Sequence, residues 1–164
     1  MEKYRYCTPE WLEETKQRAK SQPKFQQQLS KLSTKVFYRI KAEPDWGIDA
    51  DIIFGGVVDR GELLELGFYS EQDAKREADF IMAATPQEWK KLLRKEHKFL
   101  TEFMLGKITL EQGSKVGVLG VAPYANTFIE ALTQVDLQFP DEMSPDELEE
   151  FRGYVSEFRS ELGV

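Results

Sequence analysis

The sequence contains only one cysteine, Cys7, and one histidine, His97, among its 164 residues. A single cysteine forms no disulfide within the chain, and it fits a reducing compartment. One histidine excludes zinc sites built on several histidines or cysteines, and any catalytic triad that needs a second histidine. No stretch approaches the ~20 apolar residues of a membrane span. The first residues lack the apolar core of a secretory signal, so we expect a cytoplasmic protein.

Negative charge is concentrated at the C-terminal end. The formal net charge is −7, and residues 136–164 hold 9 acidic and 2 basic groups. Nucleic-acid binding relies on lysine and arginine to neutralise phosphates, so an acidic chain predicts no nucleic-acid partner. The acidic tail is typical of a solvated helix face; the alternative is an electrostatic docking surface.

Apolar residues recur at helical spacing in some segments and alternate, as in strands, in others. Thr and Ser followed by Pro at 8–9, 85–86 and 144–145 are helix-start signals. Helices are therefore predicted over 8–19, 25–32, 85–104, 123–135 and 145–162. Alternation predicts strands over 34–41, 48–58, 62–69 and 78–84, and a short fifth strand over 115–119. The first three strands are joined by short turns and should form an antiparallel meander.

Three further details complete this prediction. Gly55-Gly56, inside the second strand, predicts a bulge or a close backbone approach. Residues 70–77 are predicted to be a polar connection, and residues 136–143 a linker.

A few side chains offer chemistry, but their patterns favour structural roles. Asp49 and Asp51 share one strand face about 7 Å apart. Such a pair serves acid–base chemistry or metal binding, and it is also typical of an exposed strand. His97 is predicted on the polar face of its helix, with no serine or cysteine partner nearby in sequence. The glycines within 113–120 match neither the dinucleotide fingerprint nor the P-loop, so no nucleotide cofactor is expected.

Five basic residues between Lys90 and Lys98 share a helix with an apolar face that carries Trp89, Phe99 and Phe103. This combination resembles an interfacial amphipathic helix. A solvated helix lying on a sheet has the same pattern. The segment therefore predicts at most transient contact with an anionic membrane surface.

The order of elements resembles the sterol carrier protein type 2 family over about residues 25–135. Its landmarks are Ala78-Asp79 before the apolar run 80–82, then Gly106-Lys107, then a segment bounded by Gly113 and Gly120 ahead of a helix. The family typically shows Ala-Asp, a Gly-Lys pair and such a glycine-bounded segment in this order. The tail after residue 135 lies outside the family pattern.

The resemblance implies an α+β fold: a five-stranded mixed sheet of order 3-2-1-4-5, covered by helices on one face. It also implies an apolar tunnel between sheet and helices that takes a fatty acid, acyl-CoA or a sterol-like lipid, with no chemistry there. We therefore expect non-catalytic binding or transfer of a hydrophobic ligand inside the cell, without cofactor or metal. The residues expected to line the tunnel are Phe54, Ile81, Trp89, Leu93, Phe99, Phe103, Met104 and Phe128.

Residues 1–135 are expected to form the lipid-binding domain, and residues 136–164 an acidic helical extension packed on it. The extension carries a stripe of Leu148, Phe151, Val155, Phe158 and Leu162 that is too apolar to remain in water. We expect this helix to dock on its own chain, as a lid over 99–104, in a monomer. Docking on a second copy is the alternative.

Two functions from other classes stay open at this point. One is a protein-interaction module whose cavity is filled by its own side chains and which docks through the C-terminal helix. The other is a small enzyme that acts on acyl substrates through Asp49, Asp51 or His97.

Overall fold

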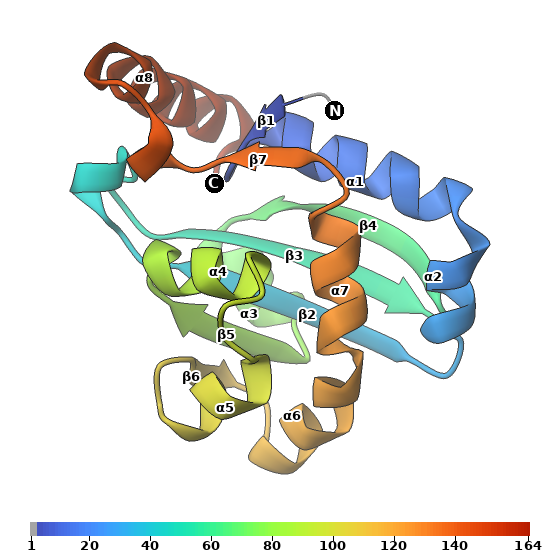
Figure 1. Ribbon diagram of the computed structural model, residues 1–164. Helices are drawn as coiled ribbons and strands as arrows, with labels where there is room; N and C mark the ends of the chain where they lie inside the picture. Colours follow the sequence, from blue (N-terminus) through green and yellow to red (C-terminus); the bar gives the residue numbers. More distant parts are fainter. Residues whose placement is uncertain (1–2) are drawn as a thin grey trace.

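A five-stranded mixed sheet forms the centre of the computed structural model, which describes residues 3–164 (Figure 1). Its strands are β2 (Ser33–Ile40), β3 (Ile52–Asp59), β4 (Glu62–Tyr69), β5 (Phe80–Ala84) and β6 (Thr109–Gln112). Their order is β4-β3-β2-β5-β6; β2 and β5 are parallel, and the other neighbours are antiparallel. Counted along the chain this order is 3-2-1-4-5, so the predicted α+β fold and sheet order are confirmed.

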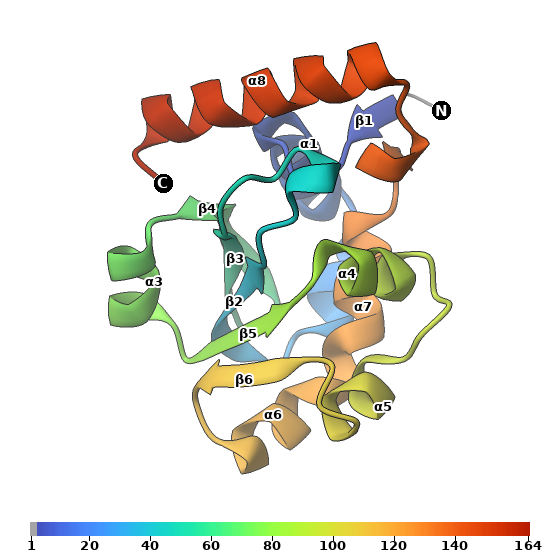
Figure 2. The same ribbon diagram turned by 90° about the vertical axis from the view of Figure 1, so that its left-hand side faces the viewer.

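Helices cover both faces of the sheet, although unequally, so the expectation of helices on one face alone is wrong. In Figure 2 the sheet stands between α3 (Glu71–Glu77) on one side and α4 (Pro86–Leu93) with α7 (Ala125–Leu132) on the other. α1 (Pro9–Ser21) packs against β4 and is followed by α2 (Pro23–Gln28). The helices α5 (Phe99–Met104) and α6 (Lys115–Val121) lie together at the β6 end.

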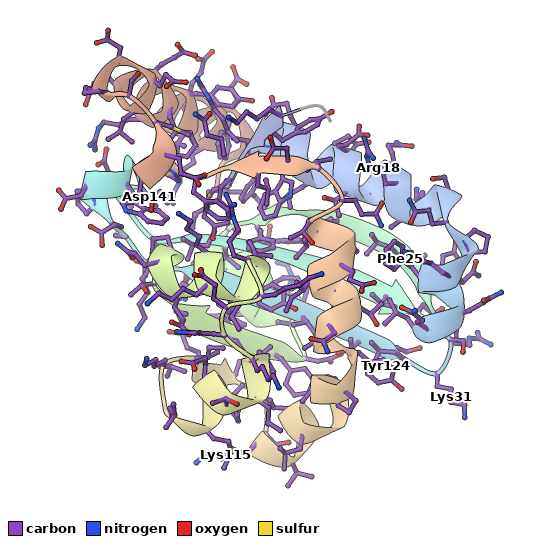
Figure 3. The ribbon with its side chains drawn as sticks, in the orientation of Figure 1. Arg18, Phe25, Lys31, Lys115, Tyr124 and Asp141 are labelled. Atoms are coloured by element: carbon purple, nitrogen blue, oxygen red, sulfur yellow. The ribbon has the colours of Figure 1, made fainter. Side chains whose placement is uncertain are left out.

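Strand alternation divides the apolar side chains between the two faces. Val36 and Met82 belong to the large core under α4 and α7, whereas Phe37 and Ile81 belong to a small cluster on the α3 face. Side chains fill the space between the layers, while Lys31 and Lys115 point away from the body (Figure 3). The α4–α7 face therefore holds most of the buried volume.

One of the two glycines of β3 has a predicted role. A Cβ at Gly55 would lie 2.3 Å from the ring of Phe37, so only glycine fits there. The register of β3 with β4 shifts between Val57 and Val58, which is a bulge. Both the close approach and the bulge that the sequence predicted are present, the bulge just beyond the glycines.

The predicted fifth strand over 115–119 is wrong, because these residues begin α6. The Ser114 hydroxyl accepts a hydrogen bond from the Gly117 N–H at 3.0 Å and caps a helix. The fifth strand is instead β6, which ends at Gln112 and pairs with β5. Gly113, at φ +102°, turns the chain between the two elements.

The single helix predicted over 85–104 is also wrong. α4 ends at Leu93, and Lys95 adopts a left-handed φ of 62° that no helix continues through. The chain resumes helical structure only at Phe99, the start of α5. His97 therefore lies in a connection and not on a helix face.

Several boundaries differ from the predicted ones because backbone pairing closes the turns. β3 begins at Ile52, since residues 43–48 form a turn closed by the Glu43–Ile48 bridge around η1 (Pro44–Trp46). β5 begins at Phe80. The predicted polar connection forms α3, whose first turn is capped by the Ser70 hydroxyl.

The predicted linker is structured as well. It forms β7 (Asp136–Gln138), which pairs in parallel with β1 (Lys3–Arg5), and then η3 (Pro140–Glu142). A short turn, η2 (Ala122–Tyr124), precedes α7. Because β1 pairs with β7, the N-terminal segment and the C-terminal extension share one part of the core.

The C-terminal helix α8 (Pro145–Leu162) begins with the predicted capping box of Ser144 and Glu147. Phe151, Val155 and Phe158 are buried in the main core and dock the helix on its own chain, whereas Leu162, at the end of the predicted stripe, is 54% exposed.

The position of α8 differs from the predicted one. The helix lies at the end of the molecule opposite α5 and α6, so a lid over 99–104 is wrong (Figure 2). The parallel β1–β7 pair carries the chain to this end. There Arg159 donates hydrogen bonds to the carbonyls of Ala50 and Asp51 at 2.8 and 2.7 Å.

Candidate functional site

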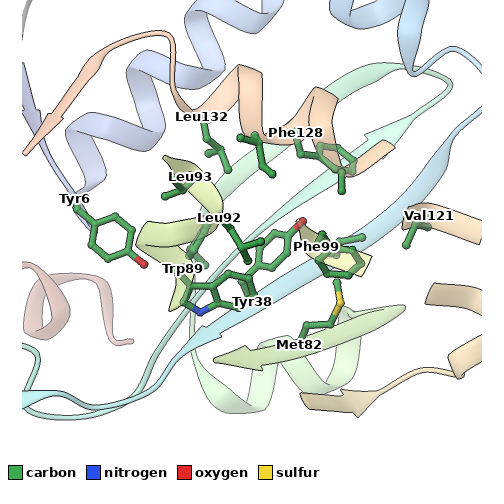
Figure 4. Close-up of a pocket in the computed structure, with 14 residues that line it drawn as sticks. Tyr6, Tyr38, Met82, Trp89, Leu92, Leu93, Phe99, Val121, Phe128 and Leu132 are labelled. Atoms are coloured by element: carbon green, nitrogen blue, oxygen red, sulfur yellow. The ribbon is translucent and has the colours of Figure 1, made fainter. Parts of the chain in front are cut away.

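An apolar cavity of about 60 Å³ lies between the sheet and the α4–α7 layer (Figure 4). Its floor consists of sheet residues, and its roof comes from α4, α5 and the segment that leads through α7. Nearly all of the atoms that it exposes are apolar. The lining residues are Tyr6, Val36, Tyr38, Phe54, Met82, Trp89, Leu92, Leu93, Phe99, Val121, Ala125, Phe128, Ile129 and Leu132.

A second apolar cavity of about 50 Å³ adjoins the first, toward β4. Phe128 and Leu132 of α7 border both cavities from above, and Val36, Tyr38 and Phe54 border both from the sheet. The two cavities therefore share α7 as part of their roof and the sheet as part of their floor.

Hydrogen bonds and ring contacts hold this wall in place. Trp89 Nε1 donates to the carbonyl of Arg39 at 3.0 Å, and its ring meets Tyr38 edge-on at 5.5 Å between centroids. Trp11 Nε1 donates to the carbonyl of Leu132 at 2.8 Å, which ties the end of α7 to α1. Phe54 packs against Tyr38 at 5.3 Å. The floor and α4 are thus firmly positioned.

The part of the roof that α7 forms is packed less tightly than the part that α4 forms. None of the residues of α7 is fully buried, whereas α4 contains Trp89, Leu92 and Leu93 in buried positions. Elements with few buried apolar contacts open at lower free energy than the core. α7 is therefore expected to move away from the sheet more easily than α4.

Tyr6 provides a polar group in the cavity wall. The residue is fully buried, and its hydroxyl has no hydrogen-bond partner within residues 3–164. Burial raises the pKa of the Tyr6 phenol well above its usual 10.0, so the group stays a neutral donor. A buried hydroxyl without a hydrogen bond is costly. A polar group of a bound molecule that accepts a hydrogen bond from Tyr6 would remove this cost.

Five of the eight residues expected to line a tunnel do line the cavity: Phe54, Trp89, Leu93, Phe99 and Phe128. Phe103 lies behind the wall, where its ring stacks on Phe99 at 6.0 Å. Phe103, Ile81 and Met104 do not line the cavity, so three of the eight expectations are wrong. Ile81 points to the α3 face because its neighbour Met82 takes the inward position. Met104 is 72% exposed, since the break at Lys95 separates α5 from the face of α4.

Other lining residues were missed by sequence reasoning. Val36 and Tyr38 share one strand face in the alternating pattern, and Leu132 follows Phe128 by one helical turn, so these signals were present. Tyr6 gave no such signal, because it reaches the cavity only through the pairing of β1 with β7.

The groups considered for catalysis do not meet at the cavity. Asp49 forms an ion pair with Arg152 of α8, and Asp51 accepts a hydrogen bond from the Ala42 N–H at 2.7 Å. His97 contacts the carboxylates of Glu88 and Glu102. Within residues 3–164, these three groups have separate partners and no shared site.

The glycines of the segment 113–120 pack closely against an aromatic ring. A Cβ at Gly117 would lie 2.8 Å from the ring of Phe80, and one at Gly113 would lie 2.6 Å from it. Glycine is therefore required at both positions to leave room for the ring of Phe80. In the part of the chain that the structure describes, no helix combines the length and apolar character needed to cross a bilayer.

Comparisons with known proteins identify the fold. No protein-family model matches the chain, and no curated protein matches its sequence. A solution structure of a conserved hypothetical protein from Thermus thermophilus, described as possibly a sterol carrier protein, aligns with a TM-score of 0.69. The identity is 16%, and the match covers 80% of this chain and 90% of that one.

Two further structures align over a similar range. A crystal structure of sterol carrier protein 2 gives a TM-score of 0.64 at 17% identity, over 78% of this chain and 97% of that one. The apo form of sterol carrier protein 2 from Yarrowia lipolytica gives 0.55 at 10% identity, over 76% and 88%. At these identities the likeness concerns architecture. The chain therefore has the fold of sterol carrier protein 2, with α8 added at its C-terminal end.

Proposed function

We propose that this protein binds the acyl chain or other apolar body of a lipid between the sheet and α7, without catalysis, and carries it inside the cell. The observation that carries the proposal is the pair of adjoining apolar cavities, which lie between the layers of a fold shared with sterol carrier protein 2. Ligand pockets are mostly apolar with few polar groups, and this one offers the Tyr6 hydroxyl.

The energetics support a cavity that a ligand fills. A void costs a folded protein about 24 cal/mol per Å³, so the larger cavity of about 60 Å³ costs about 1.4 kcal/mol. An apolar chain that fills it removes this cost, and each buried methylene adds about 0.8 kcal/mol. Pockets for small molecules have about 300–1,000 Å³, so a long chain requires α7 to move outward.

The proposed carrier also needs a surface for exchange with membranes, and we place it at the α5–α6 end. Exposed apolar side chains gather on these two helices and at the end of α5: Leu100, Met104, Leu105, Val116 and Leu119. Lys98, Lys107 and Lys115 are exposed beside them and complement anionic headgroups. Phe99, in the same short helix as Leu100, lines the cavity. An anionic bilayer is therefore the partner proposed for this end.

Displacement of a fluorescent fatty acid tests the binding. Full-length protein, freed of lipid, is titrated with the probe and then with unlabelled oleate. We expect saturable binding that oleate displaces. Ala125→Trp, which places a large side chain in the cavity, should abolish it, while Asn126→Trp, at an exposed position of the same helix, should retain it. Equal binding by both variants, or none by folded wild-type protein, contradicts the proposal.

Tyr6→Phe tests the polar anchor. The substitution removes an unpartnered buried hydroxyl, so the free energy of unfolding without ligand should stay the same or rise. Affinity for oleate should fall about tenfold, the value of one hydrogen bond of about 1.4 kcal/mol. Unchanged oleate affinity would show that the carboxylate lies elsewhere. Mass spectrometry of gently purified protein identifies the lipid that it carries.

A further inference from the structure

Three potential metal ligands converge where α4 meets α5, outside the cavity wall. His97 Nδ1 lies 3.0 Å from Oε1 of Glu88 and 3.5 Å from Oε2 of Glu102. One ligand atom from each residue lies within 4.8 Å of the other two. Glu88 belongs to α4, Glu102 belongs to α5, and His97 comes from the connection between them. The fold thus brings together residues separated by up to fourteen positions.

The two carboxylates are buried more deeply than carboxylates normally are. The exposed fraction of the side chain is 8% for Glu88 and 7% for Glu102. Buried charge is costly unless it is paired or coordinates a metal. Oε2 of Glu102 nevertheless accepts no hydrogen bond from any residue in 3–164. This buried oxygen therefore lacks a hydrogen bond and lies 3.5 Å from Nδ1 of His97.

Few positive charges face this pair. Within the described chain, the cationic groups within 4.0 Å of either carboxylate are His97 and Lys107. Lys107 Nζ lies 3.6 Å from Oε2 of Glu102, and its side chain is 55% exposed, so it is free to turn into solvent. The side chain of His97 is 26% exposed and leaves the site accessible from outside.

We propose that Glu88, His97 and Glu102 bind one divalent transition-metal ion, with Zn²⁺ as the best-fitting ion. Tetrahedral zinc with nitrogen and oxygen ligands at about 2.0–2.2 Å holds its ligand atoms about 3.3–3.6 Å apart. The two distances from Nδ1, 3.0 and 3.5 Å, are close to this spacing, and the ligand atoms of the three residues all lie within 4.8 Å of one another. Three protein ligands leave the fourth position to water.

The ion would join two parts of the cavity roof. Trp89 follows Glu88 directly and Phe99 precedes Glu102 by three residues, and both aromatic residues line the cavity. A bound ion fixes α5 against α4 and slows the separation of these side chains. This consequence rests on the proposed function, whereas the metal site itself does not.

Zinc titration of the full-length, lipid-free protein tests the site. We expect calorimetry to show one Zn²⁺ per chain, and Co²⁺ at the same site to give the visible absorption of a tetrahedral ion. Glu102→Gln and His97→Gln should each weaken binding about 100-fold or more, since even residues that only support metal ligands contribute about 10–100-fold. Glu96→Gln, at an exposed position of the same connection, is the matched control and should bind as the wild type does.

Either of two results overturns the proposal: absence of saturable Zn²⁺ binding, or equal affinity in wild type and both ligand variants. His97 is partly exposed, so His97→Gln is expected to fold even if Glu102→Gln does not. Because no lipid is present in the titration, failure of the metal site leaves the fatty-acid displacement result unaffected.

Discussion

Phe128 borders both apolar cavities, and we expect its removal to join them. The residue projects from α7 and lines both spaces, of about 60 and 50 Å³. Phe128→Ala therefore does not open an isolated void in a packed core. It lengthens a space that already exists between the sheet and α7, and so increases the length of apolar chain that fits.

The expected loss of stability follows from the partial packing of Phe128. Truncation of a fully packed phenylalanine costs about 3–5 kcal/mol. Phe128 is half-buried and borders empty space on two sides, so we expect a smaller loss of about 2 kcal/mol. Phe151 is 0% exposed and packs α8 into the core. Phe151→Ala should therefore lower the free energy of unfolding by about 4 kcal/mol.

Affinity for ligands should change in the opposite pattern. Each additional methylene that the joined space buries contributes about 0.8 kcal/mol, about fourfold in affinity. Phe128→Ala should therefore prefer longer fatty acids than the wild type does, while Phe151→Ala, away from both cavities, should keep the wild-type preference.

Urea unfolding and displacement by saturated fatty acids of increasing length measure both effects. The reasoning is refuted if Phe128→Ala loses as much stability as Phe151→Ala and leaves the chain-length preference unchanged. Phe128 would then be an ordinary core residue.

Three other expectations concern the thiol, acid stability and the membrane surface. Burial raises the pKa of the Cys7 thiol to about 12, so Ellman's reagent at pH 8 should react only after denaturation; rapid reaction of native protein would contradict this burial. A hydrogen bond from Arg39 holds the pKa of Glu71 below its usual 4.5. The charged Glu71 therefore stabilises the fold above pH 4.5, and this stabilisation is lost as the pH falls through the lowered pKa. Glu71→Gln should thus unfold more easily than wild type at pH 7 and equally at low pH, as urea titrations would show; a difference that persists in acid rules out this cause. Val116→Glu should weaken flotation with anionic vesicles, whereas Leu64→Glu, at an exposed position on β4, should not; equal losses would point to general hydrophobic adsorption.

Features that depend on near neighbours in the chain were predictable. Alternation placed β2, β3 and β4, and the Ser144 capping box marked the start of α8, because pleat and helix caps involve residues only two to four positions apart. The amphipathic stripe of α8 likewise indicated that the helix docks. The landmarks around Asp79 and Gly106 supported the family resemblance, and through it the sheet order.

The site depended on contacts that no local pattern contains. The left-handed turn at Lys95 separates α4 from α5 and leaves Met104 in solvent, although its spacing matched a continuous helix. The register of β5 against β2 turned Met82 inward, and Ile81 outward, because one residue of register exchanges the two faces. The β1–β7 pairing alone brought Tyr6 to the cavity.

Sequence by itself determined the class of this protein: an acidic α+β chain with one cysteine, whose helices and strands each carry an apolar side. Tertiary structure decided where the space is and what borders it. It also decided that Glu88, His97 and Glu102 meet, although fourteen positions and the left-handed turn at Lys95 separate the first from the last. The physical reason is that periodicity records which side of an element is apolar, whereas cavities and ligand clusters arise from long-range packing between elements.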